Sequence, residues 1–393
     1  MLDLIFWMAI AIVCYTFLGY GMVLYALVKL KKWLSPDEAG QNQDFFPPVS
    51  LVIPCFNEAD IIPAKAENSL SLDYPADKLE IIFITDGSTD NFREVLDEFP
   101  QVKCMHDNRR GGKTAAENRA MAAIKTPFVI FTDANTLLNP EAIGNMVRHF
   151  KSEKVGCVSG EKRVLMEASE EASAAGEGMY WKYESFLKRL DSELHSAVGA
   201  AGELVAFRSS LYETLPEDTI LDDFMQSMLI AAKGYKIVYE PQAYALESAS
   251  ASIKDELKRK IRISAGGWQS MKRLLSKIRP FNQGMLFFQY FSHRVLRWTI
   301  TPFLLILIFF LNISLWSAGL LYQLLMVAQL LFYFAAALGY LLENKKIKVK
   351  ILFVPFYFCL MNYAVIAGLF RFLQGSQKST WEKARRRTSQ SRS

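Results

Sequence analysis

The chain has 393 residues, of which 51% are hydrophobic, and a formal net charge of +5. This length allows one sizeable catalytic domain with further segments around it. The charge is modest and the basic residues gather beside apolar runs, which favours anionic lipid headgroups over nucleic acid as their partners. Five cysteines without paired spacing argue against a disulfide framework, and four scattered histidines argue against a zinc site.

Three uncharged runs are long enough to form membrane helices. They cover Leu4–Val28, Thr299–Leu342 and Ile351–Phe370. A membrane helix needs roughly 20 apolar residues, so the runs provide one, two and one spans respectively. We expect the first run to be a retained anchor, because it begins with Asp3 instead of a basic stretch and is longer than the core of a signal peptide.

Lys and Arg residues beside these runs predict the orientation in the membrane. One group follows the first run and another precedes the second: Lys29, Lys31, Lys32, and then Lys258, Arg259, Lys260, Arg262, Lys272, Arg273, Lys277 and Arg279. We therefore expect the region between them to be cytosolic. A further group, Lys345, Lys346, Lys348 and Lys350, fits the same side. The basic tail, with Lys383, Arg385, Arg386 and Arg387, conflicts with four simple crossings, so the number of crossings stays open.

The middle region alternates between short apolar runs and helix-like segments. Strands are predicted at 49–53, 80–85 and 128–132, and helices near 57–70, 91–98, 113–125 and 139–151. Pro54 is expected to end the first strand, and Asn139 to cap the last of these helices. Strands that alternate with helices predict an α/β fold with a mostly parallel sheet. A stretch near 168–191 with Tyr180, Trp181, Tyr183 and Phe186 is read as a membrane- or acceptor-facing amphipathic helix, or equally as a core helix.

Polar residues follow each of the three predicted strands. Asn57, Glu58 and Asp60 follow the first, Asp86 to Asp90 the second, and Asp133 to Asn135 the third. In a parallel sheet the ligand binds beyond the carboxyl ends of the strands. Asp-Gly-Ser is also ordinary turn chemistry, but three such strand ends together predict one binding edge.

These motifs resemble the nucleotide-sugar half of the family 2 glycosyltransferases. The resemblance rests on Val52-Ile-Pro-Cys-Phe-Asn-Glu58, Thr85-Asp-Gly-Ser-Thr-Asp90, Gly112-Lys113 with Asn118, and Thr132-Asp-Ala-Asn135, followed by Ile220-Leu-Asp-Asp-Phe224 and Arg259-Lys-Ile-Arg262 in the acceptor half. It covers roughly residues 48 to 270. Together with the apolar runs, it points to the membrane-bound branch that includes synthases of cellulose, hyaluronan and poly-N-acetylglucosamine. The fold it implies is the nucleotide-sugar-binding A-type fold of glycosyltransferases.

The resemblance implies a role for each residue on the donor side. Asp86 would accept hydrogen bonds from the uracil or ribose of the donor. Pro54, Asn57 and Glu58 would line the same pocket, and Lys113 would lie near the donor phosphates.

The resemblance also implies a metal ion and a catalytic base. Asp133 and Asn135 stand where the family carries Asp-x-Asp, which holds Mg²⁺ or Mn²⁺ against the diphosphate. Asn135 offers only a neutral amide oxygen. Asp223 is the expected general base that deprotonates the acceptor, and the neighbouring Asp222 is expected to bind the acceptor. The two could instead be simple helix N-terminal charges.

The acceptor side departs from the pattern of polysaccharide synthases. Arg259 and Arg262 stand where those enzymes carry Gln-x-x-Arg-Trp. Both are expected to bind the diphosphate of the donor. Ile263 replaces the Trp of that motif. Trp268 lies a little over one turn further on, as an acceptor contact or a membrane-interface anchor. Gly202, in Gly199-Ala-Ala-Gly-Glu203, would allow close approach of the acceptor.

The sequence thus predicts an inverting glycosyltransferase that moves a sugar from a UDP-sugar to a polysaccharide and forms β links. Two alternatives stay open: single transfer to a lipid or lipid-linked acceptor, and a non-catalytic assembly subunit. Expected partners are the nucleotide sugar, the acceptor, membrane lipids and assembly subunits, with no nucleic acid. The expected location is the plasma (inner) membrane, crossed several times, with a cytosolic catalytic domain. The expected division is an anchor (1–32), a glycosyltransferase domain (33–278), an interfacial helix (279–298), about three transmembrane helices (299–373) and a basic tail (374–393).

Overall fold

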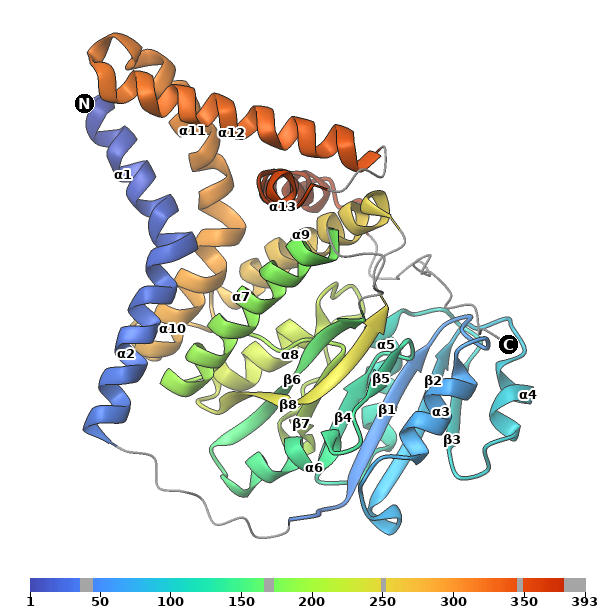
Figure 1. Cartoon of the computed structure of the whole chain (residues 1–393). Helices are drawn as coiled ribbons and strands as arrows, with labels where there is room; N and C mark the ends of the chain where they lie inside the picture. The colour runs from blue at the N-terminus through green and yellow to red at the C-terminus, as the bar shows by residue number, and fades with distance from the viewer. Residues whose placement is uncertain (36–44, 166–172, 249–251, 345–348, 378–393) are drawn as a thin grey trace.

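An eight-stranded mixed sheet forms the centre of the molecule, and long helices rise from one side of it (Figure 1). The structure is a computed structural model that describes residues 1–35, 45–165, 173–248, 252–344 and 349–377. The strand order is β3-β2-β1-β4-β7-β6-β8-β5. The predicted α/β fold is therefore confirmed, with membrane-type helices added to it. Lys345, Lys346, Lys348 and the basic residues of the tail lie outside the described residues.

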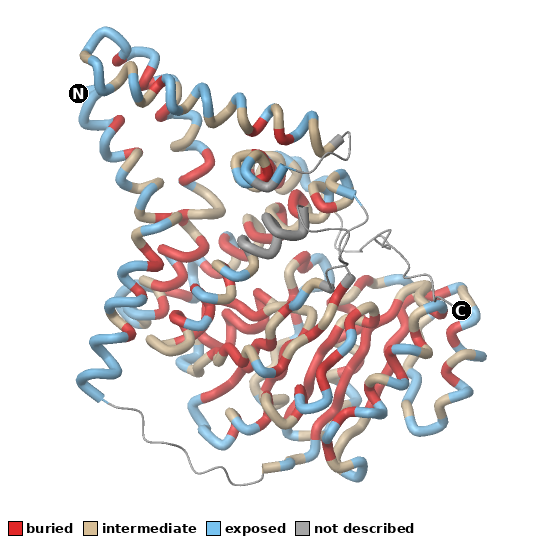
Figure 2. The backbone as a smooth tube through the Cα atoms, viewed as in Figure 1, coloured by how far each residue is buried: buried red, intermediate tan, exposed pale blue. Residues whose placement is uncertain are grey.

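The first half of the sheet is parallel, as the apolar runs predict. β1 (Val49–Cys55) lies between β2 (Leu79–Asp86) and β4 (Phe128–Thr132), and β3 (Lys103–Asp107) pairs with β2. Successive side chains point to opposite faces. The side chains on one face of the sheet pack against α3 (Ile62–Leu70), α4 (Phe92–Asp97) and α6 (Ala142–Val147). Those on the other face pack against α5 (Lys113–Ala123) and α8 (Asp222–Ala232). Figure 2 shows the resulting continuous band of buried residues.

The second half of the sheet was not predicted from the sequence. β7 (Leu204–Arg208) runs antiparallel to β4 and to β6 (Val155–Leu165). β8 (Lys236–Ser248) is parallel to β6 and antiparallel to the short β5 (Thr136–Leu138). This half carries the chain from the third strand end back across the sheet to α8, and so brings the acceptor motifs to the edge that holds the donor motifs.

Two local predictions differ from the structure. Pro54 does not end β1, which runs on to Cys55. Pairing with β4 has already stopped at Val52, and only the β2 side continues, so the missing N–H of Pro54 is tolerated. Asn139 does not cap α6, which starts at Ala142. Its side chain instead bonds to β8, with Oδ1 accepting from Tyr244 N at 2.8 Å.

Within the described residues, four helices are long and apolar enough to cross a membrane. They are Leu2–Leu34, Gly284–Ser314, Leu320–Glu343 and Ile351–Leu373. The first consists of α1 (Leu2–Cys14), η1 (Tyr15–Gly19) and α2 (Tyr20–Leu34), and the second of α10 (Gly284–Tyr290), η6 (Phe291–Ile300) and α11 (Thr301–Ser314). η7 (Trp316–Ala318) precedes α12 (Leu320–Asn344), and α13 (Lys350–Leu373) is the last. Figure 2 shows their largely exposed surfaces, and Leu331 and Phe334 of α12 are 63% and 68% exposed. Apolar side chains exposed in this way are suited to contact with the lipids of a membrane.

Two helices connect the sheet to these spans (Figure 1). α7 (Ser173–Leu194) packs Leu187 and Leu190 against Tyr20 and Leu24 of α2. The segment near 168–191 is thus helical from 173, residues 166–172 lie outside the described part, and the helix faces the first span. α9 (Ile253–Leu274) lies along α13, and a methyl group on Gly368 would come within 2.5 Å of Ser264 Cβ.

The remaining short elements complete the chain. They are the 3₁₀ turns η2 (Ala76–Lys78), η3 (Arg148–Lys151) and η5 (Ser209–Leu211).

Candidate active site

Asn57 joins the ends of the first two strands. Its φ of 52° lies in the left-handed region, which Asn tolerates better than most residues. This conformation lets Asn57 N donate to Ser88 Oγ at 3.1 Å, while Oδ1 accepts from Thr89 N at 2.8 Å. Ala59 N adds a bond of 2.8 Å to Asp90 Oδ2. The strand-end residues therefore lie at one edge, as the sequence predicts.

Asp86 is enclosed at this edge and is only 1% exposed. Its Oδ2 accepts from Gly112 N at 2.6 Å, and its Oδ1 from Gly111 N at 3.2 Å and from Arg119 at 3.0 Å. Gly112 has φ of 95°, which only glycine adopts readily. Asp86 thus fixes the loop that starts α5, and its direct contact with a nucleotide stays a prediction.

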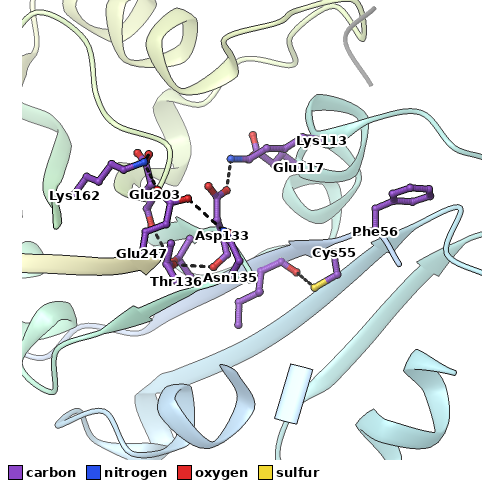
Figure 3. Close-up of polar contacts among 12 residues, drawn as sticks. Cys55, Phe56, Lys113, Glu117, Asp133, Asn135, Thr136, Lys162, Glu203 and Glu247 are labelled. Carbon is purple, nitrogen blue, oxygen red and sulfur yellow. Dashed lines mark hydrogen bonds and ion pairs between the residues drawn. The ribbon is translucent and has the colours of Figure 1, made fainter. Parts of the chain in front are cut away.

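Lys113 and Asp133 meet where α5 begins and β4 ends. Nζ of Lys113 lies 2.7 Å from Oδ1 of Asp133 (Figure 3). The two side chains are 18% and 31% exposed, so both can reach a ligand. Burial lowers the pKa of Lys113, but Asp133, Asp222 and neighbouring carboxylates outweigh it and raise that pKa well above its usual value. Lys113 is therefore a permanent cation at the site.

Gly202, which the sequence assigns to the acceptor side, lies beside Lys113 and Asp223. A methyl group on Gly202 would lie 3.0 Å from Asp223 Oδ2 and 3.3 Å from Lys113 Nζ. Glycine here lets the backbone before β7 pass close to both side chains. Gly202, Asp223, Lys113 and Asp133, which come from four separate segments, thus surround one point.

Asp223 lies in the first turn of α8 and has the electrostatic properties of a base. Burial and the neighbouring Asp222 raise its pKa to about 7, against the lowering effect of Lys113. A carboxylate with a pKa near neutrality accepts a proton far more readily than an ordinary aspartate. Asp222 is 8% exposed. Both aspartates are in the first turn, so they also suit the helix dipole.

The two predicted arginines differ in their surroundings. Burial lowers the pKa of Arg262, whereas the charges of Asp222, Asp133 and Asp223 raise it, which places Arg262 among the site carboxylates. Arg259 forms an ion pair with Glu256, in which its Nε and Nη2 each donate to a carboxylate oxygen at 3.0 Å. Arg262 is therefore the better candidate for the donor diphosphate.

A buried ionic cluster borders Asn135 and was not predicted. Asn135 Nδ2 donates to Glu247 Oε1 at 3.3 Å (Figure 3). Lys162, whose side chain is 2% exposed, pairs with Glu247 and with Glu203 at 2.7 Å. Lys162 and Glu247 lie in β6 and β8, strands that the sequence did not reveal, and charged residues inside a strand were the only signal. This cluster links Asn135 to the segment that carries Gly202.

Three further residues of the predicted site, Pro54, Glu58 and Trp268, are buried in or bonded to neighbouring parts of the chain. Pro54 is buried in β1, and Glu58 accepts from Phe56 N at 3.5 Å. The indole N–H of Trp268 donates to Val365 O of α13 at 3.4 Å, so this ring is held on the last candidate span. The acceptor role of Trp268 stays a prediction.

The donor set suits a divalent ion that is shared with a substrate. In the described ranges, no three His, Cys, Asp or Glu side chains are grouped to hold a metal by themselves. Mg²⁺-type ions are commonly held by one or two carboxylates and the substrate phosphates. The half-exposed Asp133 fits such a site, with Asn135 next to it.

Comparisons with known proteins show which family part of the chain resembles. The model of the family "Glycosyl transferase family 2" matches residues 50–215. The chain carries a family 2 glycosyltransferase domain. A poly-beta-1,6-N-acetyl-D-glucosamine synthase from Staphylococcus epidermidis is 28% identical over 238 residues, 57% of this chain and 56% of the relative. One from Staphylococcus aureus (strain MSSA476) is 28% identical over 245 residues, 59% and 57% of the two chains.

A solved structure extends the likeness to the fold of nearly the whole chain. It is a mannosyltransferase from Pyrobaculum calidifontis in complex with GDP-Man and Mn²⁺, with a TM-score of 0.71. It is 23% identical and covers 95% of this chain and 99% of its own. The likeness in fold thus includes both the sheet and the membrane-type helices. The chain spans a little over half the length of the curated relatives it matches, and Asp223 lies beyond the residues matched by the family model.

Proposed function

We propose that the chain is an inverting glycosyltransferase that moves a sugar from a UDP-sugar to a polysaccharide at the membrane and forms β links. The observation that carries this proposal is the convergence of Lys113, Asp133, Gly202 and Asp223. The names of the Staphylococcus synthases support a polysaccharide as acceptor. The GDP-Man in the Pyrobaculum structure makes GDP-sugars the donors to test next.

The donor is expected along the loops after β1, β2 and β4. Asn57, Glu58 and Pro54 would border its base and ribose, and Asp86 would hold the amides of the loop that starts α5. Lys113 and Arg262 bring two positive charges to the position of the diphosphate. Mg²⁺ or Mn²⁺ held by Asp133, with Asn135 beside it, would offset further negative charge when bound. The Mn²⁺ in the Pyrobaculum structure supports a divalent ion of this kind.

The acceptor is expected between Gly202 and the start of α8. Asp223 takes the proton of the attacking hydroxyl, and Asp222 orients the acceptor beside it. The attacking oxygen forms the bond to the anomeric carbon as the bond to the diphosphate breaks. One base without a covalent intermediate gives inversion, and hence β links from an α-linked donor.

The four candidate spans support a multi-pass membrane protein. Basic residues at both ends of the sheet domain favour a cytosolic catalytic site, where nucleotide sugars are available. A reporter enzyme fused to the loop before β1, and another fused before α12, would test this orientation in the inner membrane.

The test of the activity uses the full chain in lipid nanodiscs with a panel of labelled UDP- and GDP-sugars. We expect transfer from one of them, and loss of about 10²–10⁴-fold in Asp223→Asn. Asp77→Asn, an exposed aspartate in η2, is the matched control and should leave turnover unchanged. Near-normal turnover in Asp223→Asn would remove the base assignment. No transfer from any donor would favour the non-catalytic assembly subunit.

A second candidate is single transfer to a lipid or lipid-linked acceptor. Two observations favour it: Ile263 replaces the expected Trp, and Trp268 is bound to α13. The acceptor side of the site then continues into the candidate spans. Product length separates the two candidates, since only a polymerase gives products that lengthen with time and donor supply.

A further inference from the structure

Glu117 is an acidic side chain at the site that none of the roles above uses. It lies one helical turn after Lys113 in α5 and is 5% exposed. Its Oε1 is 3.9 Å from Lys113 Nζ, and Figure 3 shows the two side chains next to each other. Lys113 lies much closer to Asp133, at 2.7 Å. Glu117 is therefore buried at the outer limit of ion-pair distance from a lysine that lies closer to Asp133, and a buried charge with so weak a partner is unfavourable.

The groups that face Glu117 are mostly acidic. Asp222 and Asp223 face it from α8, Tyr212 from the loop after η5, and Lys113 from its own helix. The carboxyl group of Glu117 faces that of Asp222 within hydrogen-bond reach. Two carboxylates can form such a bond only when one of them carries a proton, because an ionised carboxylate is an acceptor alone.

The surroundings indicate which of the two holds the proton. Burial and the charge of Asp222 raise the pKa of Glu117 well above its usual value. Oδ2 of Asp222 is buried and receives no hydrogen bond from an ordinary donor group in the described part of the chain. A proton on Glu117 supplies Asp222 with a donor and removes one negative charge next to Asp223.

We propose that Glu117 is a positioning residue that acts as a neutral carboxylic acid, donating a hydrogen bond to Asp222 and so fixing the Asp222–Asp223 pair against the acceptor. This inference rests on the proposed function, in which Asp223 is the base. It explains how four acidic side chains, Glu117, Asp133, Asp222 and Asp223, lie around Lys113 and Arg262.

Two substitutions of similar size separate the neutral from the charged form. Glu117→Gln keeps a neutral donor, so kcat should stay within about threefold of wild type, whereas Glu117→Leu removes the donor and should lower kcat about 10- to 100-fold. KM for the donor should change little in both variants. Glu67→Gln, an exposed glutamate of α3, is the matched control. If Glu117→Gln is as slow as Glu117→Leu, the carboxylate form is required and the inference is wrong.

An infrared measurement tests the protonation without turnover. At about pH 8, above the pKa of about 7 of Asp223, the full chain should show the C=O band of a protonated carboxylic acid. Carbon-13 labelling of glutamate should shift the band in the wild type. Glu117→Gln should lack it, and Glu67→Gln should keep it. Absence of a glutamate band in the wild type overturns the inference, even for a fully active enzyme. A protein that transfers no sugar but shows the band contradicts the proposed function alone.

Discussion

Nζ of Lys113 lies 2.7 Å from Oδ1 of Asp133 and joins the start of α5 to the end of β4. Asp222 and Asp223 also act on this ammonium, so Lys113 neutralises carboxylates from both halves of the site. In the proposed function the same cation would also face a diphosphate that approaches Asp133. Its removal should therefore affect the site in two measurable ways.

The first expected effect is on catalysis. Lys113→Gln leaves the partly buried carboxylates without their cation, and kcat/KM should fall by at least about 30-fold, which corresponds to about 2 kcal/mol, the lower end for truncation of a buried charge pair. Initial rates with the identified donor measure this. Lys125→Gln, an exposed lysine just after α5, should behave as wild type. A loss below about threefold would mean that Lys113 does not contact the reacting groups.

The second expected effect is on metal binding. A divalent ion has to share Asp133 with Lys113, so Lys113→Gln should bind Mn²⁺ about tenfold more tightly when no nucleotide is present. Titration of Mn²⁺ followed by electron paramagnetic resonance measures the affinity, after EDTA treatment that should also abolish transfer by the wild type. Asp133→Ala should bind Mn²⁺ weakly in the same titration. Equal affinities in wild type, Lys113→Gln and Asp133→Ala would place the ion elsewhere.

The pH dependence should report the base. Asp223 must be ionised to accept the proton, and its pKa is raised to about 7. Since the protonated form dominates below that pKa, kcat/KM should fall on the acid side, about tenfold per pH unit below about pH 6. The rate profile between about pH 5 and 9 measures this limb. A flat profile down to about pH 5, the range of an ordinary aspartate, would exclude Asp223 as the titrating base.

The parallel half of the fold and its strand-end residues could be predicted because both are local features. β1, β2 and β4 are short apolar runs, and Asn57, Asp86 and Asp133 lie at or just after their ends. The antiparallel half could not be predicted, since β6 and β8 are long, mix charged with apolar residues, and pair over large sequence distances. Lys162 and Glu247 were missed for this reason.

The role of Asp86 shows a second limit of the sequence. Its motif predicts contact with the donor, but its partners in the structure are Gly111, Gly112 and Arg119, which lie 25 to 33 residues away. Glu117 is similar, because only the packing of α5 against α8 brings it to Asp222. A motif identifies which residues matter, whereas their partners depend on the tertiary structure.

Gly202 allows a test of how closely the acceptor segment approaches the base. In Gly202→Ala the new methyl group would lie 3.0 Å from Asp223 Oδ2 and 3.3 Å from Lys113 Nζ, so both side chains must move by a few tenths of an ångström. We expect kcat to fall at least about tenfold, because small displacements of a base are costly. Thermal stability should change little, since both neighbours are flexible side chains. Gly144→Ala in α6, where the methyl group meets nothing within 4 Å, is the matched control and should keep full activity.

A second buried ionic cluster, formed by Glu184, Arg294 and Arg297, joins α7 to the second candidate span. Glu184 of α7 is 3% exposed, and its carboxylate lies 2.7 Å from Arg294 and 2.9 Å from Arg297 of η6. Glu184→Gln removes a buried negative charge that both arginines contact, so the free energy of unfolding should fall by about 3–5 kcal/mol. Thermal unfolding in nanodiscs measures the change.

The control for this prediction lies on the same helix. Arg189 pairs with Glu193 at 2.8 Å, but Arg189 is 65% exposed. Arg189→Gln should therefore cost less than about 1 kcal/mol, as expected for a solvent-exposed pair. Equal effects of Glu184→Gln and Arg189→Gln would show that the cluster does not hold α7 against the span. A large loss for Glu184→Gln alone, with the domain released from the span before it unfolds, would show that these two arginines fix the catalytic domain at the membrane.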